Sequence, residues 1–303
     1  MLNCGVSKSI AGLALQDARG EWSGMDVDFC RALAAALFGS PEKTRFIPLS
    51  AVERFPALLA GRVDLIAGGA TWTLARELGL KVDFVGPVMF SSQRVLVRAD
   101  SGITALAQLN ARPVCLARAT THLQHLQSYF ELEGWRLEAK AKDSFVEARA
   151  AFEAGECEAL SADEVALAGV KPAGDTAAAY QLLPEALSSE PLSAVVPGNQ
   201  PSWERVVRWV LFMLIAAETN GIDQHAAATL VAGTRTEAIA AQARRYGKAL
   251  GLEPTWAERA VAAVGHYGEV FERNLGSGSL IGLPRGPNRP WNEGGMLYAP
   301  PLH

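Results

Sequence analysis

The chain reads Val63-Asp-Leu-Ile-Ala67 and then, without a break, Gly68-Gly-Ala-Thr-Trp-Thr-Leu-Ala-Arg76. A short apolar run bounded by glycine predicts a buried parallel strand, and the threonine-rich turn after it leads into a helix. The turn places backbone N–H groups and hydroxyls at the carboxyl end of the strand, where open α/β sheets bind ligands. The guanidinium of Arg76 can return over Thr71 and hold a carboxylate in two hydrogen bonds. A helix cap and a solvated arginine explain the same residues without a ligand.

Strands and helices alternate on both sides of this turn, which predicts an α/β fold with parallel sheets. In the first part of the chain we expect strands over 3–7, 44–49, 63–67, 84–89 and 94–98, and helices over 26–38 and 51–60. From about residue 100 a second unit has strands over 113–117, 135–140, 158–161 and 180–183, and helices over 104–110, 120–133, 144–155 and 163–169.

The order of these elements predicts two lobes joined by a two-strand hinge. We expect the chain to cross between lobes near 97–101 and again near 189–194. Residues 1–98 and 193–303 would then form the first lobe, and residues 99–192 the second. The first lobe carries an extended helical C-terminal region, with helices expected over 202–217, 224–231, 237–250 and 255–274 and an irregular surface tail after Gly276.

Composition narrows the classes of partner. The 303 residues are 49% hydrophobic, which is enough to fill two lobes, and 28 Lys and Arg against 32 Asp and Glu give a net charge of −4. No basic block is present that could neutralise phosphates, so we expect no nucleic-acid partner. The longest apolar run, 209–217, is about half of a bilayer crossing, so we do not expect a membrane-spanning protein.

Cofactors and metals are not expected either. The glycines of Gly276-Ser-Gly278 lack the third member of a dinucleotide-binding motif and follow no strand. His122 and His125 lie three residues apart on a predicted helix, but the sequence shows no third metal ligand beside them.

The chain has four widely spaced cysteines and no CxxC pair. They are Cys4, Cys30, Cys115 and Cys157. Three disulfide pairings are open to them, and four buried free thiols are the alternative.

The second unit contains a similar turn at its own first helix. The strand 114–117 runs into Arg118-Ala-Thr-Thr121, where free N–H groups, the helix dipole and two hydroxyls favour an anion. Two such helix starts, one in each lobe, could hold one carboxylate between them. Asp163 follows the next strand and suits an ammonium group in a cleft, although an aspartate there is also an ordinary helix cap.

Several segments over nearly the whole chain are similar to the periplasmic solute-binding proteins of polar amino-acid ABC transporters, and most closely to the general L-amino-acid binding proteins. They are Asn3-Cys-Gly-Val-Ser7, Trp22-Ser-Gly-Met-Asp-Val-Asp-Phe-Cys-Arg-Ala32, Glu53-Arg-Phe55, Thr71-Trp-Thr-Leu-Ala-Arg76, Glu190-Pro-Leu192, Tyr267-Gly-Glu-Val-Phe-Glu-Arg-Asn274 and Trp291-Asn-Glu-Gly-Gly-Met-Leu-Tyr-Ala-Pro-Pro301. The last two segments are specific to that subgroup.

The resemblance implies a type II two-lobe binding protein without enzymatic activity that delivers a free amino acid to a membrane permease. By position, Arg76 would pair with the α-carboxylate, supported by the hydroxyls of Thr71 and Thr121, and Asp163 would receive the α-ammonium. The resemblance also implies disulfides within each lobe, Cys4 with Cys30 and Cys115 with Cys157, and therefore an oxidising, periplasmic location. The first residues lack the basic and apolar regions of a signal sequence, so we expect that none exists or that it has been removed.

Departures from the family pattern affect the ligand. Gly69 and its neighbour replace hydroxyl or amide residues and leave only backbone donors, and Ala119 replaces a glycine in the second turn. Ile10 and Leu13 lie where related proteins have aromatic residues. Two arginines, Arg54 and Arg118, favour a polar or acidic ligand, although Arg54 also fits a structural or rim position.

Two other functions fit the same fold. One is an enzyme similar to cyclohexadienyl dehydratases, which needs an acid or base in the cleft, and Glu164 beside Asp163 is the nearest candidate. The other is a ligand-sensing domain, against which the chain shows neither a DNA-binding helix-turn-helix nor a membrane anchor.

Overall fold

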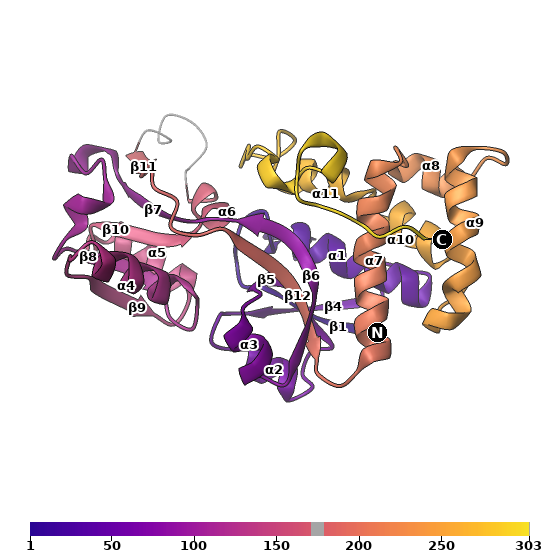
Figure 1. Ribbon diagram of the computed structural model, residues 1–303, viewed down its shortest axis with the longest axis horizontal. Coiled ribbons are helices and arrows are strands. Elements are labelled where there is room, and N and C mark those ends of the chain that lie inside the picture. Colours follow the sequence, from indigo (N-terminus) through magenta and orange to yellow (C-terminus); the bar gives the residue numbers. More distant parts are fainter. Residues whose placement is uncertain (171–178, 303) are drawn as a thin grey trace.

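The protein is built on two five-stranded sheets that lie side by side, as the computed structural model in Figure 1 shows. The structure describes residues 1–170 and 179–302. We use first lobe for the first sheet with the helices packed on it, and second lobe for the second sheet with its helices. The α/β fold predicted from the alternation of strands and helices is confirmed, but the sheets are mixed and not purely parallel, because β12 in the first sheet and β7 in the second run antiparallel to their neighbours.

The first sheet has the strand order β4-β1-β5-β12-β6. Its strands are β4 (Thr44–Leu49), β1 (Leu2–Ser7), β5 (Leu65–Thr71), β12 (Glu190–Pro197) and β6 (Val82–Ser91). The first three are parallel, and β12 runs antiparallel to both of its neighbours. Because β5 continues to Thr71, the turn begins two residues before the helix α3 (Leu74–Gly79), whose N-cap is Thr73.

The second sheet has the order β11-β7-β10-β8-β9. Its strands are β11 (Tyr180–Leu182), β7 (Gln93–Arg98), β10 (Ala159–Asp163), β8 (Pro113–Ala117) and β9 (Glu138–Lys142), and its helices are α4 (His122–Leu132), α5 (Phe145–Glu153) and α6 (Glu164–Ala168). The helix expected over 104–110 is a single 3-10 turn, Leu106–Leu109. Thr121 is the N-cap of α4, as the sequence predicts, and β10 ends at Asp163.

The hinge lies earlier in the chain than predicted. β7 pairs with β10 and β11 in the second sheet, so the chain leaves the first sheet at Ser92 and the crossing predicted at 97–101 is wrong in position. The apolar alternation of 94–98 indicates a strand but carries no sign of which sheet it joins. The return crossing lies between β11 and β12, and β12 is already in the first sheet at Glu190.

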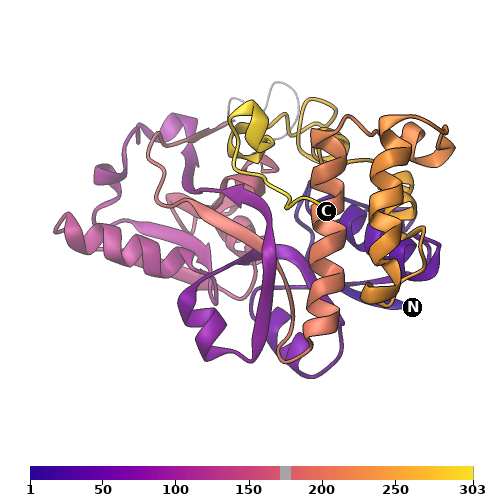
Figure 2. The same ribbon diagram turned by 45° about the vertical axis from the view of Figure 1, so that its right-hand side comes forward.

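Helices cover the first sheet and extend beyond it. α1 (Met25–Phe38) is buried against the sheet and against the C-terminal helices, and α2 (Arg54–Leu59) precedes β5. The C-terminal helices are α7 (Pro201–Thr219), α8 (Gln224–Thr229), α9 (Arg235–Leu250), α10 (Trp256–Val264) and α11 (Tyr267–Asn274). Figures 1 and 2 show α7, α8, α9 and α10 in orange beyond the first sheet, on the side away from the second lobe.

The single helix expected over 255–274 is two helices. Gly265 adopts φ 84°, a conformation that favours glycine, and ends α10. His266 then caps α11 in a capping box with Glu269. The tail after α11 is irregular, as predicted, and Asn288 makes two hydrogen bonds to the backbone of Phe90 in β6.

Both disulfides implied by the family resemblance are present. Cys4 in β1 is bonded to Cys30 in α1, and Cys115 in β8 is bonded to Cys157 before β10. Each bridge stays within one lobe. Among the described residues, none of the helices has the length and apolarity that a bilayer crossing requires.

Candidate ligand-binding site

A cavity lies between the two lobes at the carboxyl ends of β1, β5 and β8. Its walls come from both lobes, as the sequence predicts for a ligand site. The first lobe contributes Ser7, Lys8, Ile10, Leu13, Leu49, Ser50, Ala51, Arg54, Gly69 and Thr71, and the second contributes Ala117, Thr120, Thr121, His122, Ser144, Phe145, Ala162, Asp163 and Ala166. Ile10 and Leu13 therefore give the first lobe's wall an apolar part.

Arg54, at the start of α2, is directed into this cavity. One guanidinium nitrogen, Nη1, donates to the carbonyl oxygen of Gly69 at 2.5 Å, and the buried Nε has no hydrogen-bond partner in residues 1–170 and 179–302. Burial and the nearby Arg76 lower the pKa of Arg54 to about 9, although Asp163 and Glu190 oppose that shift. An anionic group that enters here would relieve this electrostatic cost and pair the free Nε–H.

Arg76 lies close to the cavity without lining it. Its Nη1 donates to the carbonyl oxygen of Thr71 at 2.8 Å, and its guanidinium lies over the ring of Phe55, 5.5 Å from the centroid. Burial lowers the pKa of Arg76, while the charges of Glu190 and Asp163 act in the opposite direction. The expected return of Arg76 toward Thr71 is thus present, but in this structure it reaches the backbone carbonyl instead of the hydroxyl.

Thr71 and Thr121 meet across the cavity and share one acceptor. Their hydroxyl oxygens are 3.4 Å apart, and both donate to Oε2 of Glu190, at 2.5 Å from Thr71 and 2.9 Å from Thr121. Glu190 is only 1% exposed at the start of β12. The two helix starts predicted to face one another therefore do so.

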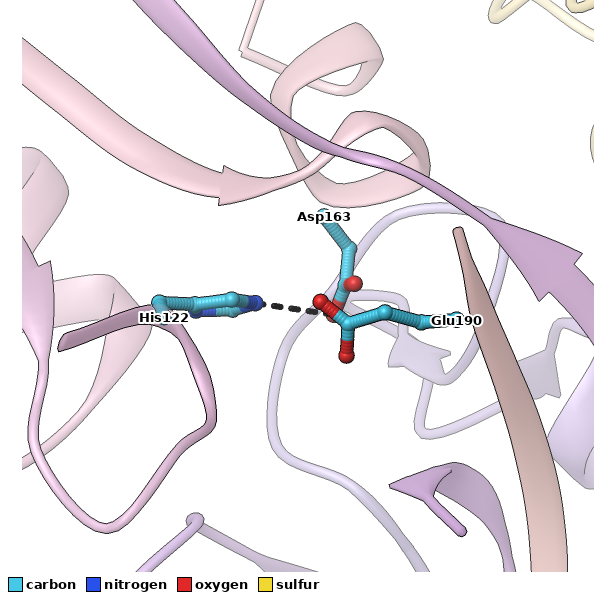
Figure 3. Close-up of side chains that lie close together, drawn as sticks. All are labelled: His122, Asp163 and Glu190. Carbon is cyan, nitrogen blue, oxygen red and sulfur yellow. Dashed lines mark ion pairs between the residues drawn. The ribbon is translucent and has the colours of Figure 1, made fainter. Parts of the chain in front are cut away.

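Asp163 faces His122 in the second lobe. Figure 3 shows the imidazole of His122 directed at Asp163, with the carboxylate of Glu190 beside it. Nε2 of His122 lies 3.4 Å from Oδ2 of Asp163. The other oxygen, Oδ1, is buried without a partner among the described residues, as is Nδ1 of His122. Asp163 is the N-cap residue of α6, but its side chain makes no capping hydrogen bond within the described part of the chain.

A polar network connects this site to the hinge. Gln93, fully buried at the start of β7, donates to the backbone oxygen of His122 and to Ser161, and its Oε1 lies 3.1 Å from Nδ1 of His125. On the other hinge segment, Ser188 accepts from the backbone N–H of Gln93 and donates to Oε1 of Glu190. Both chain crossings are therefore tied to the residues at the base of the cavity.

Two predicted site residues lie elsewhere. Arg118 forms an ion pair with Asp143, N to O at 2.7 Å, and both side chains are 56% exposed. The prediction that Arg118 contacts the ligand is not supported, because an adjacent surface acid already pairs with its guanidinium. Ala119 is exposed at φ 59° and contributes no atom to the cavity lining in the described part of the chain.

The fold explains why Gly68 and Gly69, shortly before Thr71, carry no side chain. A Cβ on Gly68 would stand 2.7 Å from Oδ1 of Asp26, which is far too close. Gly69 adopts φ 65°, and a Cβ there would lie 3.0 Å from Oγ of Ser7. Asp26 is itself buried and accepts from both the backbone and the hydroxyl of Ser7. The backbone of Gly69 is thus what this wall presents to a ligand.

His122, Asp163 and Glu190 could also be considered as metal ligands, because one atom from each lies within 4.8 Å of the others. Glu190 is poorly suited, since its two oxygens already accept from three hydroxyls. A dication would also meet the positive charges of Arg54 and Arg76, both of which interact with Asp163 and Glu190. The mixed charges fit a small zwitterion better than a metal ion.

The sequence did not single out Glu190 as a site residue. A signal was present, because an acid directly before the apolar strand that re-enters the first lobe is costly to bury without partners. Its partners, Thr71 and Thr121, are 119 and 69 residues away, so the constellation follows from the fold and not from local spacing.

Comparison with known proteins agrees with this geometry. A two-lobe α/β fold with a polar cavity at the hinge defines a solute-binding protein, and residues 2–258 match the family of bacterial extracellular solute-binding proteins, family 3. The chain belongs to that family, which confirms the resemblance.

Curated relatives match over almost the full length. The chain is 35% identical to the glutamate/glutamine/aspartate/asparagine-binding protein BztA of Rhodobacter capsulatus, over 99% of this chain and 90% of that protein. It is 33% identical to the general L-amino acid-binding periplasmic protein AapJ of Rhizobium johnstonii, over 99% and 89%. A solved periplasmic binding protein from Brucella ovis with glutathione bound is 36% identical, with a TM-score of 0.94 over 100% of this chain and 96% of that one.

Proposed function

We propose that this protein binds a free L-amino acid between its lobes in the periplasm and delivers it to the permease of an ABC transporter. One observation carries the proposal. Two residues of opposite charge that line the same cavity, Arg54 in the first lobe and Asp163 in the second, each have a buried polar atom, Nε and Oδ1, without a partner among the described residues. Buried polar groups without partners are costly, and an α-carboxylate with an α-ammonium would satisfy both.

We assign Arg76 to the α-carboxylate of the ligand as well, as a second guanidinium in addition to that of Arg54. Its charge already interacts with Glu190 and Asp163 at the site. A carboxylate between Arg54 and Arg76 would also offset the mutual repulsion of the two guanidiniums, which contributes to the lowered pKa of Arg54.

The cavity supports a polar or acidic ligand side chain. Lys8 and Arg54 contribute positive charge to its lining, and serine hydroxyls are present on both lobes. The names of BztA and AapJ give amino acids as their ligands, and the Brucella ovis structure contains glutathione. Glutathione carries a free α-ammonium and α-carboxylate at its γ-glutamyl end, so a site that binds a polar amino acid can also bind that end of glutathione.

Ligand binding would favour the closed arrangement because its partners lie on both lobes. Converting a mostly open population to a mostly closed one requires roughly 5 kcal/mol of preference for the closed form. Two desolvated charge pairs, one with Arg54 and one with Asp163, supply free energy of that order.

The proposal assigns no catalysis to the site. Glu164, the acid that the sequence offers for a dehydratase, borders a different cavity, between the hinge and the C-terminal tail. Incubation with prephenate or arogenate tests this point directly, and product formation would favour the enzyme instead.

A thermal-shift panel of the twenty amino acids with added glutathione tests the binding function. A ligand at 100 times its Kd should add about 2.7 kcal/mol to the free energy of unfolding. At this chain length that corresponds to a rise in Tm of roughly 4 °C. We expect the largest rise with a polar or acidic amino acid or with glutathione, and a flat panel would refute the proposal.

A further inference from the structure

The hydrogen bonds of Glu190 fix the direction in which two threonine hydroxyls can act. A hydroxyl has one proton to donate and two lone pairs with which to accept. The protons of both Thr71 and Thr121 are directed at the same oxygen, Oε2 of Glu190. Neither hydroxyl then has a proton left for a ligand.

Glu190 acts as an acceptor because it is ionised. Burial alone would raise its pKa, but hydrogen bonds from Thr71, Ser188 and Thr121, with the charge of His122, outweigh burial and lower it. The groups that face this carboxylate include His125, whose Nδ1 is 3.3 Å from Oε1. Arg54 and Arg76 add positive charge nearby.

We propose that Glu190 is a positioning residue whose carboxylate takes the hydroxyl protons of Thr71 and Thr121 and so presents only their lone pairs to the ligand. The inference rests on the proposed function and deepens it. Without Glu190, either hydroxyl could rotate and donate to a carboxylate. With it, both become acceptors, which suits an ammonium group.

The number of acceptors matches the ligand group. An α-ammonium has three N–H donors. The cavity offers the oxygens of Thr71 and Thr121 and the unpartnered Oδ1 of Asp163, and an oxygen of Asp163 lies within 4.8 Å of Glu190. The carboxylate is then left to Arg54 and Arg76. This reverses the role that the resemblance implies for the two threonine hydroxyls, which was to support the carboxylate.

Glu190→Gln tests the proposal with little change in shape. The amide must place its NH2 at one of the two oxygen positions. At Oε1 the NH2 would meet Nδ1 of His125, which donates to the amide oxygen of Gln93, so we expect it at Oε2. There at least one threonine hydroxyl must accept from the NH2 and so turns a lone pair away from the ligand. The probes are the amino acid with the largest thermal shift and its α-deaminated analogue; for L-glutamate the analogue is glutarate. By calorimetry we expect Glu190→Gln to weaken binding of the amino acid about 10- to 100-fold, and to weaken binding of the deaminated analogue by less than about threefold.

Two controls separate this role from a general loss of structure. Glu185→Gln makes the same substitution in the segment that leads back to the first lobe, on a glutamate whose Oε1 accepts from the backbone of Leu106 outside the cavity. It should leave affinity unchanged. In a Thr71→Val, Thr121→Val background, Glu190→Gln should cause no further loss of affinity, because it acts through those hydroxyls.

The outcomes are distinct. Equal loss for the amino acid and its deaminated analogue, or a further loss in the valine background, would show a structural role and overturn the inference. Unchanged affinity in Glu190→Gln would overturn it as well. If none of the twenty amino acids binds the unmodified protein, the proposed function itself fails, and the inference fails with it.

Discussion

At the scale of single residues, Arg54 and Arg76 divide the task of holding a carboxylate. Arg54 lines the cavity and its buried Nε has no partner among the described residues, whereas Arg76 lies outside the lining and donates to Thr71. We predict that Arg54→Ala and Arg76→Ala each weaken amino-acid binding by about 2 to 4 kcal/mol, roughly 30- to 1000-fold, with the larger loss for Arg54→Ala.

Calorimetry with the best amino acid of the panel measures both losses. Arg118→Ala is the matched control, because its guanidinium pairs with Asp143 at the surface, and it should stay within about threefold of the unmodified protein. Unchanged affinity in both Arg54→Ala and Arg76→Ala would contradict the carboxylate assignment.

Asp26 predicts a dependence of stability on pH. Burial raises its pKa from 3.8 to about 6, although hydrogen bonds from Ser7 act against the shift. The native state therefore holds this proton more tightly than the unfolded chain. Its contribution is fully present below about pH 4 and is lost as the pH rises through about 6, a change of roughly 3 kcal/mol.

Asp26→Asn removes this titration while keeping an oxygen that can accept from Ser7. We expect the difference in free energy of unfolding between Asp26→Asn and the unmodified protein to shift in favour of the variant between pH 4 and pH 7. Urea titrations at both values measure it. A difference that is the same at the two pH values would show that Asp26 does not titrate in this range.

At the scale of elements, each disulfide connects a strand to a segment distant in the chain. The Cys115–Cys157 bridge closes a loop of 42 residues and the Cys4–Cys30 bridge a loop of 26. In the loop-entropy model these contribute about 4 and about 3.5 kcal/mol. We predict that replacing both cysteines of a bridge by serine lowers the free energy of unfolding by the corresponding amount and therefore lowers the urea midpoint. The Cys115→Ser, Cys157→Ser variant should destabilise the second lobe.

Fluorescence of Trp135, which packs against Phe130 in the core of the second lobe, can report on that lobe. An unchanged midpoint in the Cys115→Ser, Cys157→Ser variant would count against the prediction.

Much of the element order could be predicted because it depends on local signals. Apolar runs, glycine stops and threonine caps place β5, α3 and α4 within a few residues. The break between α10 and α11 was missed, since a helical apolar pattern continues through Gly265 and only its backbone angle separates the two. The sheet to which β7 belongs is a tertiary choice, and no local pattern contains it.

The residues of the candidate site that lie at strand ends could be predicted from the sequence. Thr71 and Asp163 are the last residues of their strands, Thr121 lies after β8 at the start of α4, and all three line the cavity. Glu190 could not be assigned, because its role depends on hydroxyls from both lobes reaching one oxygen. The ion pair of Arg118 with Asp143 at the surface could not be predicted either, because the two residues are 25 positions apart in the sequence.

At the scale of the whole molecule, the two crossings of the chain and the network of Gln93 and Ser188 suggest rotation of the lobes as rigid bodies. We predict that the radius of gyration, measured by small-angle X-ray scattering, decreases when the best amino acid of the panel is added. Asp163→Asn should reduce this change at equal ligand concentration, because the ligand then gains less from touching the second lobe. A radius that does not depend on ligand in the unmodified protein would argue against closure.

The crowding of Gly68 by Asp26 limits how this site can change over evolution. A serine or threonine at position 68 would be tolerated only after the acid had been replaced or moved, and the acid in turn holds Ser7 at the neighbouring wall. A side chain at position 68, which does not itself line the cavity, thus requires at least two coordinated substitutions, with a destabilised intermediate between them. Selection for a different nutrient would act more readily on Ile10, Leu13 and Phe145, whose side chains border the cavity without being tied into the polar network.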